Sequence, residues 1–279
     1  MKLKRTVISL LNRSEPTRDA LEWWIHRQTK IYVLSYPKCG RTWLRLMIGK
    51  ALDDHYRLGV ANPMELGHMY GLHRDIPRIR VTHEHAHRAE VIEADKRKFR
   101  GKTVVFLVRD PRDVVVSMYF EASRRSTQFT GELGEFIRQP VGGIDAIIAY
   151  YNAWADSAHV PRRFALVRYE DLHHQPGPVL ANVLDAMELP VAPTAIDMAV
   201  DFSKFDNMRS LEVANTFKSA RLRPAKAGDA ESFKTRKGKI GGYRQYMSPA
   251  DLDYVNTRIA TRLSPAYAEY RQPDSQLRA

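Results

Sequence analysis

Residues 31–43 read Ile-Tyr-Val-Leu-Ser-Tyr-Pro-Lys-Cys-Gly-Arg-Thr-Trp, and they decide the fold class of this chain. An apolar, β-branched run ends at Ser35, a tight turn containing Gly40 follows, and a helical pattern begins at Thr42. In a strand–turn–helix unit, the first N–H groups of the helix and the positive end of its dipole face the turn and bind anions. Lys38 adds a positive charge inside the turn. The stretch therefore predicts a phosphate-binding site.

The order of residues in this turn differs from that of the common P-loop. The P-loop reads G-x-x-x-x-G-K-[ST], with its lysine directly after the second glycine. Here Lys38 precedes Gly40, which is the single glycine of the turn. The residue types suit phosphate, but their order does not match an ordinary ATP or GTP site. Other anion-binding parts of the chain must therefore decide the ligand.

Length and composition predict one principal domain. The chain has 279 residues without a Pro/Gly/Ser-rich linker or an internal repeat, which suits one α/β domain with a substantial core. We expect a helical extension over residues 1–30, the domain over 31–270 and a tail over 271–279. No apolar run is long enough to cross a membrane. The single cysteine excludes an intrachain disulfide.

The net charge of +12, from 44 basic and 32 acidic residues, predicts an anionic partner. The charge alone does not choose among a nucleotide, nucleic acid and an acidic membrane. Leu3, Val7, Leu10 and Leu11 could form one face of a basic helix with weak contact to a membrane surface. Packing of such a helix on its own domain is the more common outcome. The apolar core is too short for a signal peptide, so we expect a cytoplasmic protein.

The spacing of apolar runs predicts a P-loop-like α/β fold with a parallel sheet and helices on both faces. Four strand-like runs recur along the chain: Ile31–Ser35, Ile79–Thr82, Thr103–Val108 and Phe164–Arg168. Helical patterns separate or follow them: Thr42–Leu52, Arg112–Ala122, Ile144–Ala158 and Pro178–Met187. In such doubly wound folds ligands bind at the carboxyl ends of the strands, so residues just past those ends are the candidates for a site.

A second anion-binding element follows the third strand-like run, in the stretch Arg109-Asp-Pro-Arg-Asp-Val-Val-Val-Ser117. The Asp-Pro pair suits the cap and the first turn of a helix. On that helix Arg109 and Ser117 could both reach an anionic group, and the guanidinium fork of arginine suits phosphate. Arg112 and Asp113 have two open interpretations, a surface ion pair or a helix cap.

A third anion-binding element is the stretch Arg236-Lys-Gly-Lys-Ile-Gly-Gly-Tyr-Arg244. Its glycines let the backbone approach an anion while Arg236 and Lys237 neutralise it. Alone this loop is a weak signal, because similar loops also bind nucleic acid.

The three elements, in this order, resemble the sulfotransferase family that uses 3′-phosphoadenosine-5′-phosphosulfate (PAPS). Four segments carry the resemblance: Tyr36-Pro-Lys-Cys-Gly-Arg-Thr-Trp43, Arg109–Ser117, Arg168-Tyr-Glu-Asp-Leu172 and Arg236–Arg244. The first two together are specific, and the last two would be weak alone. The resemblance implies a cytosolic-type enzyme that transfers a sulfuryl group from PAPS to a hydroxyl, releases 3′-phosphoadenosine-5′-phosphate (PAP) and needs no metal.

The resemblance also implies a role for individual residues. The 5′-phosphosulfate should be held by the turn residues Lys38, Cys39, Gly40, Arg41 and Thr42. The 3′-phosphate should bind Arg109 and Ser117, with Arg236, Lys237 and Gly238 closing over it. The adenine should lie against Trp43, Tyr169 and the stretch Phe202–Met208, which contains Phe205.

The expected general base is His83. The family places a histidine in a Lys-Thr-His pattern after a strand, and His83 ends the second strand-like run. Val81 replaces the lysine of that pattern, and Glu84 is a competing base. His83, His85 and His87 would share one face of a strand and could bind zinc, an alternative that the resemblance disfavours.

Cys39 and Arg41 depart from the family pattern, which usually has serine and often threonine at these positions. One interpretation is a small-residue exchange and an additional phosphate contact. The alternative is that the helix dipole, Lys38 and Arg41 lower the pKa of the thiol. Oxidation of Cys39 would then block the nucleotide.

The acceptor cannot be read from motifs. We expect it to contact three stretches outside the nucleotide site: Asn62–Asp75, Ser123–Val141 and Thr216–Thr235. Tyr70, His73 and Phe129 are candidate pocket residues. A small alcohol or phenol, a sugar hydroxyl and a lipid-linked glycan all remain open, as does the oligomeric state.

Two other functions were weighed against sulfuryl transfer. A P-loop nucleotide kinase or NTPase should have a G-K-[ST] turn and a magnesium-binding carboxylate at a strand end, and neither is evident. A nucleic-acid-binding protein would suit the charge but should cluster basic residues with aromatic platforms. We therefore expect a sulfotransferase with a hydroxyl-bearing acceptor and no nucleic-acid partner.

Overall fold

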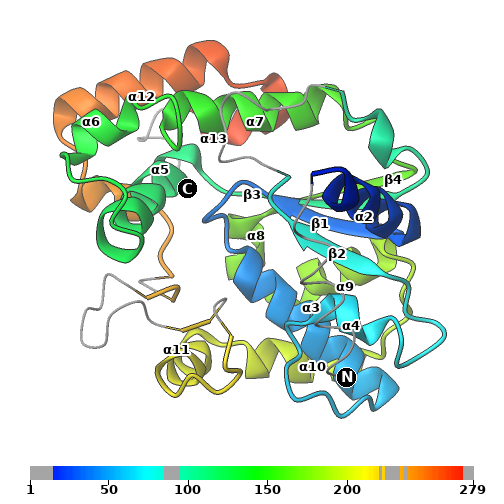
Figure 1. The fold of residues 1–279 in the computed structure, drawn as a ribbon. Helices are drawn as coiled ribbons and strands as arrows, with labels where there is room; N and C mark the ends of the chain where they lie inside the picture. The colour runs from blue at the N-terminus through cyan, green and yellow to red at the C-terminus, as the bar shows by residue number, and fades with distance from the viewer. Residues whose placement is uncertain (1–14, 85–94, 220–221, 224–232, 236–237, 273–279) are drawn as a thin grey trace.

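Four parallel strands form the central sheet of the computed structural model, which describes residues 15–84, 95–219, 222–223, 233–235 and 238–272 (Figure 1). The strands are β1 (Ile31–Ser35), β2 (Ile79–Thr82), β3 (Thr103–Val108) and β4 (Arg163–Arg168), in the spatial order β2-β1-β3-β4. The predicted parallel sheet is confirmed, and β4 begins one residue before the expected position. Because all four strands are parallel, their carboxyl ends lie at one edge.

The helices complete a single α/β domain. Their bounds are α2 Glu15–Gln28, α3 Arg41–Tyr56, α4 Leu66–Met69, α5 Pro111–Phe120, α6 Leu133–Ile137, α7 Ile144–Asp156, α8 Tyr169–His174, α9 Pro176–Ala186, α10 Pro193–Phe202, α11 Phe205–Val213, α12 Pro249–Arg262 and α13 Ala268–Arg271. Short 3₁₀ turns cover Arg97–Phe99, Gly242–Gln245 and Pro265–Tyr267, and a π-helical turn covers Glu121–Arg125. None of the described helices combines the length and apolar character that crossing a bilayer requires.

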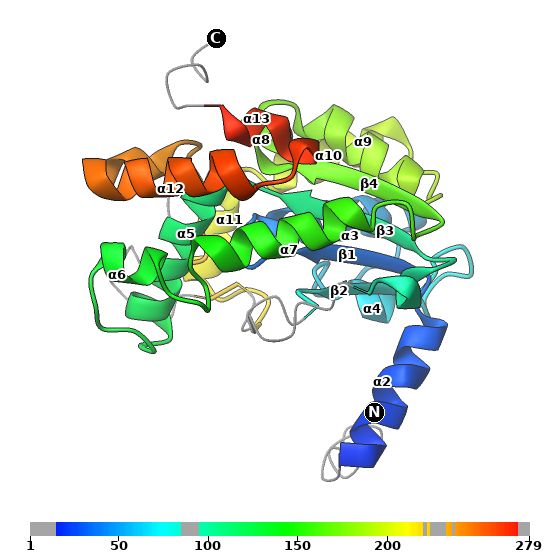
Figure 2. The ribbon, with the colours of Figure 1, turned by 90° about the horizontal axis from the view of Figure 1, so that it is seen from above.

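Helices cover both faces of the sheet. α3, α9 and α10 lie on one face, and α7 and α12 lie on the other (Figures 1 and 2). Every residue of β1 and β3 is consequently buried, as expected for central parallel strands. On the α7 face, Phe106 packs against Trp154 with ring centroids 5.4 Å apart. These two layers leave the carboxyl edge of the sheet for loops and helix starts.

Buried polar contacts hold the start of α5 against the C-terminal segment. Asp110 caps the helix by accepting from the N–H of Arg112 at 2.9 Å. The Arg112 guanidinium is 1% exposed and donates to the carboxylate of Asp110 and to the carbonyl of Tyr270 at 3.0 Å. Asp113 accepts from the N–H of Tyr243 at 3.0 Å. The surface-pair interpretation of Arg112 and Asp113 is therefore wrong, because tertiary packing buries both side chains.

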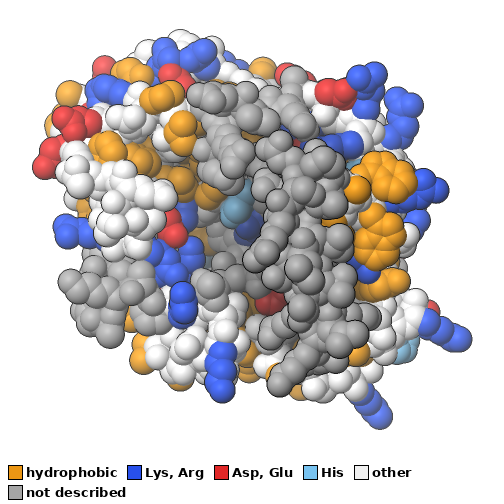
Figure 3. Space-filling view, viewed as in Figure 1, with side chains coloured by type: hydrophobic (Ala, Val, Ile, Leu, Met, Phe, Trp, Pro, Cys, Tyr) orange, Lys and Arg blue, Asp and Glu red, His pale blue; other side chains and the backbone are white. Residues whose placement is uncertain are grey.

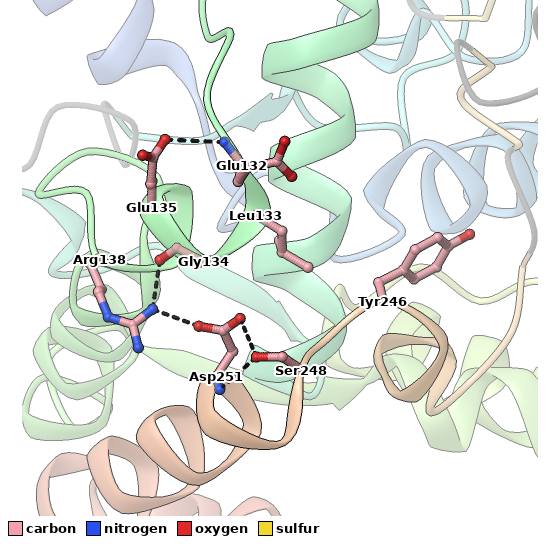
Figure 4. Close-up of a pocket in the computed structure, with 8 residues that line it drawn as sticks. All are labelled: Glu132, Leu133, Gly134, Glu135, Arg138, Tyr246, Ser248 and Asp251. Carbon is pink, nitrogen blue, oxygen red and sulfur yellow. Dashed lines mark hydrogen bonds and ion pairs between the residues drawn. The ribbon is translucent and has the colours of Figure 1, made fainter.

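A shallow surface pocket lies between α6 and α12 (Figure 4). Arg138 donates to the carboxylate of Asp251 and to the carbonyl of Gly134, both at 2.6 Å. Ser248 caps α12 by accepting from the N–H of Asp251 at 3.1 Å. These groups pair with one another and connect the two helices, so this pocket has an evident structural role.

Candidate functional site

A cavity of about 580 Å³ opens at the carboxyl edge of the sheet. Its walls come from the turn after β1, from α5, α8 and α11, and from segments 234–235 and 238–246. Figure 3 shows a hollow at the centre of this face, with a histidine and Lys or Arg side chains inside it. Eleven predicted site residues line this one cavity: Lys38, Gly40, Arg41, Thr42, Trp43, His83, Arg109, Ser117, Tyr169, Phe205 and Gly238.

The turn after β1 has the conformation of an anion cradle. Lys38 and Gly40 have φ angles of 71° and 90°, in the left-handed region, and Gly40 immediately precedes α3. The first N–H groups of α3 therefore face the cavity, with the positive end of the helix dipole behind them. A Cβ at Gly40 would lie 2.5 Å from the ring of Tyr169, so only glycine fits this position.

A carboxylate that the sequence did not reveal lies beside Lys38. Glu121 accepts from the Nζ of Lys38 at 2.7 Å and from the Nζ of Lys234 at 3.0 Å. Burial would raise the pKa of Glu121, but Lys38 and Lys234 outweigh it and lower that pKa to about 2. Burial and the nearby Lys234 lower the pKa of Lys38 to about 8, against the opposing effect of Glu121. One sequence signal for Glu121 was available: it comes four residues after Ser117, and residues four apart lie on the same face of a helix.

The second predicted anion-binding element, Arg109–Ser117, contains a buried hydrogen-bond donor. The Nη2 of Arg109 lies 3.2 Å from the carboxylate of Asp113 and donates to the carbonyl of Lys239 at 2.8 Å. The buried Nε of Arg109 has no hydrogen-bond partner within the described part of the chain. Ser117 lines the same cavity two turns further along α5. Arg236 and Lys237 lie outside the described residues.

Aromatic side chains form part of the cavity wall. The rings of Trp43 and Tyr169 meet edge to face at 5.9 Å. A Cβ at Gly238 would lie 2.7 Å from the ring of Phe205, so the glycine lets the backbone close onto that ring. The imidazole Nε2 of His173 donates to the carbonyl of Gly238 at 2.9 Å. His173 lies on α8 and lines this cavity.

His83 follows β2 and lies in the cavity with a defined tautomer. Its Nδ1 lies 2.9 Å from the carbonyl oxygen of Ser35, and a carbonyl oxygen only accepts. Nδ1 therefore carries the hydrogen, and the lone pair of Nε2 accepts a hydrogen bond from Nη2 of Arg41. Glu84, the competing base, is paired with Lys96 at 3.0 Å and does not line the cavity.

The remaining sequence expectations are untested. The zinc alternative involves His85 and His87, which lie outside the described residues, as do residues 1–14 of the proposed membrane contact. Tyr70, His73 and Phe129 do not line the cavity. Of the three expected acceptor stretches, the part that the structure describes contributes only Lys234 and Thr235 to the cavity wall.

Cys39 points into the protein core, away from the cavity. Its Sγ is fully buried and lies 3.3 Å from the hydroxyl of Tyr151. Burial raises the pKa of the Cys39 thiol to about 12. The hypothesis of a low-pKa, redox-sensitive thiol is therefore wrong, because tertiary burial outweighs the helix dipole and the nearby cations.

The native protein should consequently resist thiol reagents. At pH 8 we expect modification of Cys39 by iodoacetamide to be roughly 10³-fold slower than that of a free cysteine, because so little thiolate is present. Mass spectrometry of native and denatured protein measures both rates. Rapid modification of the native protein, or peroxide inactivation that Cys39→Ser abolishes, would contradict this expectation.

Comparison with known proteins identifies the family. The family described as "Sulfotransferase domain" matches residues 28–265. The chain belongs to the sulfotransferase family. It is 25% identical to cytosolic sulfotransferase 10 of Arabidopsis thaliana over 85% of this chain and 79% of that one. It is 24% identical to flavonol 3-sulfotransferase of Flaveria bidentis, over 84% and 81% of the two chains.

A solved structure supports the sulfotransferase fold. The mouse sulfotransferase SULT7A1, in complex with PAP, superposes with a TM-score of 0.62 over 88% of each chain, at 19% identity. The cavity described above is therefore set in a domain of sulfotransferase architecture.

Proposed function

We propose that this sulfotransferase uses PAPS and transfers its sulfuryl group to a hydroxyl. The observation that carries the proposal is the meeting of the Lys38 turn and the Arg109–Ser117 element in one cavity that also has an aromatic end. A nucleotide with anionic groups at both its 5′ and 3′ positions matches two separate cationic elements. A ligand with one phosphate chain would not need the second element.

The chemistry of the cavity fits this donor. The buried Nε of Arg109 is a donor suited to a phosphate oxygen, and we assign the 3′-phosphate to Arg109 and Ser117. We assign the 5′ end to Lys38, Arg41 and Thr42 and the main chain of the turn. The adenine then lies among Trp43, Tyr169 and Phe205. Arg236 and Lys237 remain candidates to close over the 3′-phosphate beside Gly238.

Two side chains do the chemical work in this proposal. When bound, PAPS supplies a sulfuryl group whose bond to the 5′-phosphate oxygen breaks as the acceptor oxygen bonds to sulfur, leaving PAP. The Nε2 of His83 takes the proton of the acceptor hydroxyl, since Nε2 carries the lone pair of the ring and His83 lines the cavity. Lys38 stabilises the negative charge that develops on the leaving oxygen, by analogy with phosphoryl transfer.

The acceptor is proposed only as a hydroxyl compound. Small alcohols, phenols, sugars and lipid-linked glycans are the classes to screen with labelled PAPS. We also propose a cytoplasmic location, as the name of the Arabidopsis relative suggests. The membrane contact of residues 1–14, and the division of the chain at residues 30 and 270, remain predictions.

Ligand binding separates this proposal from its rivals. We expect PAP to raise the melting temperature of the protein more than ATP or single-stranded DNA does, because of the three only PAP has a terminal 3′-phosphate monoester for Arg109 and Ser117. A larger shift with ATP would indicate a nucleotide kinase or NTPase. A larger shift with DNA would indicate a nucleic-acid-binding protein.

Replacing Arg109 by alanine should weaken PAP binding by about ten- to a hundredfold, because a charged hydrogen-bond donor to the 3′-phosphate is lost. Calorimetric titration measures the dissociation constant. Arg162→Ala is the matched control, since it removes the same charge from an exposed pair with Glu188 outside the cavity. Unchanged PAP affinity in Arg109→Ala would contradict the assignment.

A further inference from the structure

The charge arrangement around His83 departs from the family pattern in two linked ways. Val81 occupies the lysine position of the Lys-Thr-His pattern, where it pairs with Val33 in the sheet. Arg41 occupies the position where the family often has threonine, at the first residue of α3. A cation is thus absent from the β2 position of the pattern and present at the helix N-terminus.

The Arg41 side chain reaches the histidine directly. Its guanidinium contacts the Nε2 of His83, while the carbonyl of Ser35 engages the Nδ1 at 2.9 Å. Both ring nitrogens are therefore engaged in this structure. Arg41 also lines the cavity together with Lys38 and Thr42, the residues assigned to the anionic 5′ end of the donor.

We propose that Arg41 is a positioning residue that holds the Nε2 lone pair of His83 until a donor anion draws the guanidinium away. This inference deepens the proposed function and rests on it. A guanidinium binds a phosphate or sulfonate group through an ion pair and often through two parallel hydrogen bonds, whereas a neutral imidazole offers it a single acceptor atom. When a phosphate or sulfonate oxygen enters the turn, Arg41 exchanges its partner and the lone pair of His83 becomes available to the acceptor hydroxyl.

This arrangement makes the base dependent on the donor. In the free protein, an acceptor hydroxyl meets an imidazole whose lone pair is already occupied. In the loaded protein, the same arginine neutralises negative charge on the donor, and Nε2 can accept a proton. Arginine suits this exchange because it stays charged at every relevant pH and has several N–H donors.

Acylation of His83 tests the contact without any nucleotide. We expect diethyl pyrocarbonate to modify His83 about tenfold faster in the Arg41→Thr variant than in the wild-type protein, because one charged hydrogen bond to Nε2 is lost. Mass spectrometry of peptides follows His83 separately from the other histidines. Arg74→Thr, whose side chain is 91% exposed, is the matched control and should leave the rate unchanged. Equal rates of His83 acylation in the Arg41→Thr variant and the wild-type protein would overturn the proposal.

PAP binding tests the exchange of partners. If Arg41 must leave His83 before it binds the donor anion, His83→Ala should tighten PAP binding by roughly three- to tenfold. This gain in affinity should vanish when Arg41 is also replaced by threonine. Strictly additive effects of the two substitutions would overturn the proposal. If the unmodified protein does not bind PAP at all, the proposed donor is wrong, whereas the acylation experiment still decides the Arg41–His83 contact.

Discussion

Replacing His83 by asparagine should lower kcat for sulfuryl transfer by ~10²–10⁴, the usual range for loss of a general base. Asparagine keeps a polar side chain of similar length but has no basic lone pair to accept the hydroxyl proton. The Nδ1 of His83 lies against the Ser35 carbonyl and carries the hydrogen, which leaves the lone pair on Nε2, the atom that contacts Arg41. The loss should therefore appear in kcat and not as weaker donor binding.

The measurement is kcat at saturating PAPS together with the dissociation constant of PAP. His174→Asn is the matched control, because this exposed histidine lies beyond the cavity wall and should leave kcat unchanged. An asparagine variant with full activity would remove His83 from the mechanism.

Replacing Lys38 by alanine should lower the rate by ~10²–10³, the effect of removing one preorganised donor from a developing oxyanion. Lys38 lies in the turn before α3 with a left-handed φ of 71°, its side chain is only 14% exposed, and its ammonium group is held by Glu121 at 2.7 Å. Glu121 keeps its contact with Lys234 in the variant, and the fold should survive. Lys30→Ala, on the exposed surface, is the matched control.

The charge state of Lys38 adds a pH dependence. Burial and Lys234 lower its pKa to about 8 in the free protein, so the ammonium form predominates below that pH and is lost above it. The value of kcat/KM for PAPS should accordingly fall as the pH rises through about 8. In Lys38→Arg the guanidinium stays charged, and this alkaline loss should disappear. An identical alkaline loss in both proteins would assign it to another group.

The elements of the fold were predictable because their signals are local. β1, β2 and β3 have the bounds that the apolar runs indicated, and the buried residues Leu44, Met47, Ile48 and Leu52 of α3 follow helical spacing. Buried parallel strands need continuous apolar runs, and a helix packed on a sheet needs apolar residues three and four apart. Such periodicities are readable without knowing any tertiary contact.

The burial of individual side chains was not predictable. The sequence placed Cys39 between two cations at a helix start, yet its thiol packs in the core against Tyr151. A surface ion pair was one of the two interpretations of Arg112, yet its side chain is buried against Asp110 and the C-terminal segment. In both cases a residue more than a hundred positions away, Tyr151 for Cys39 and Tyr270 for Arg112, contributes to the burial, and no local pattern encodes that contact.

The sequence by itself predicted where anions would bind, because in the first two elements a strand end, a helix start and a basic residue adjoin in one short stretch. Only the tertiary structure decided how those elements act together. It placed Glu121 between Lys38 and Lys234. It also brought the guanidinium of Arg41, on the helix after β1, into contact with His83, which follows β2. The physical reason is that parallel strands converge at their carboxyl ends, so residues remote in sequence share one cavity there.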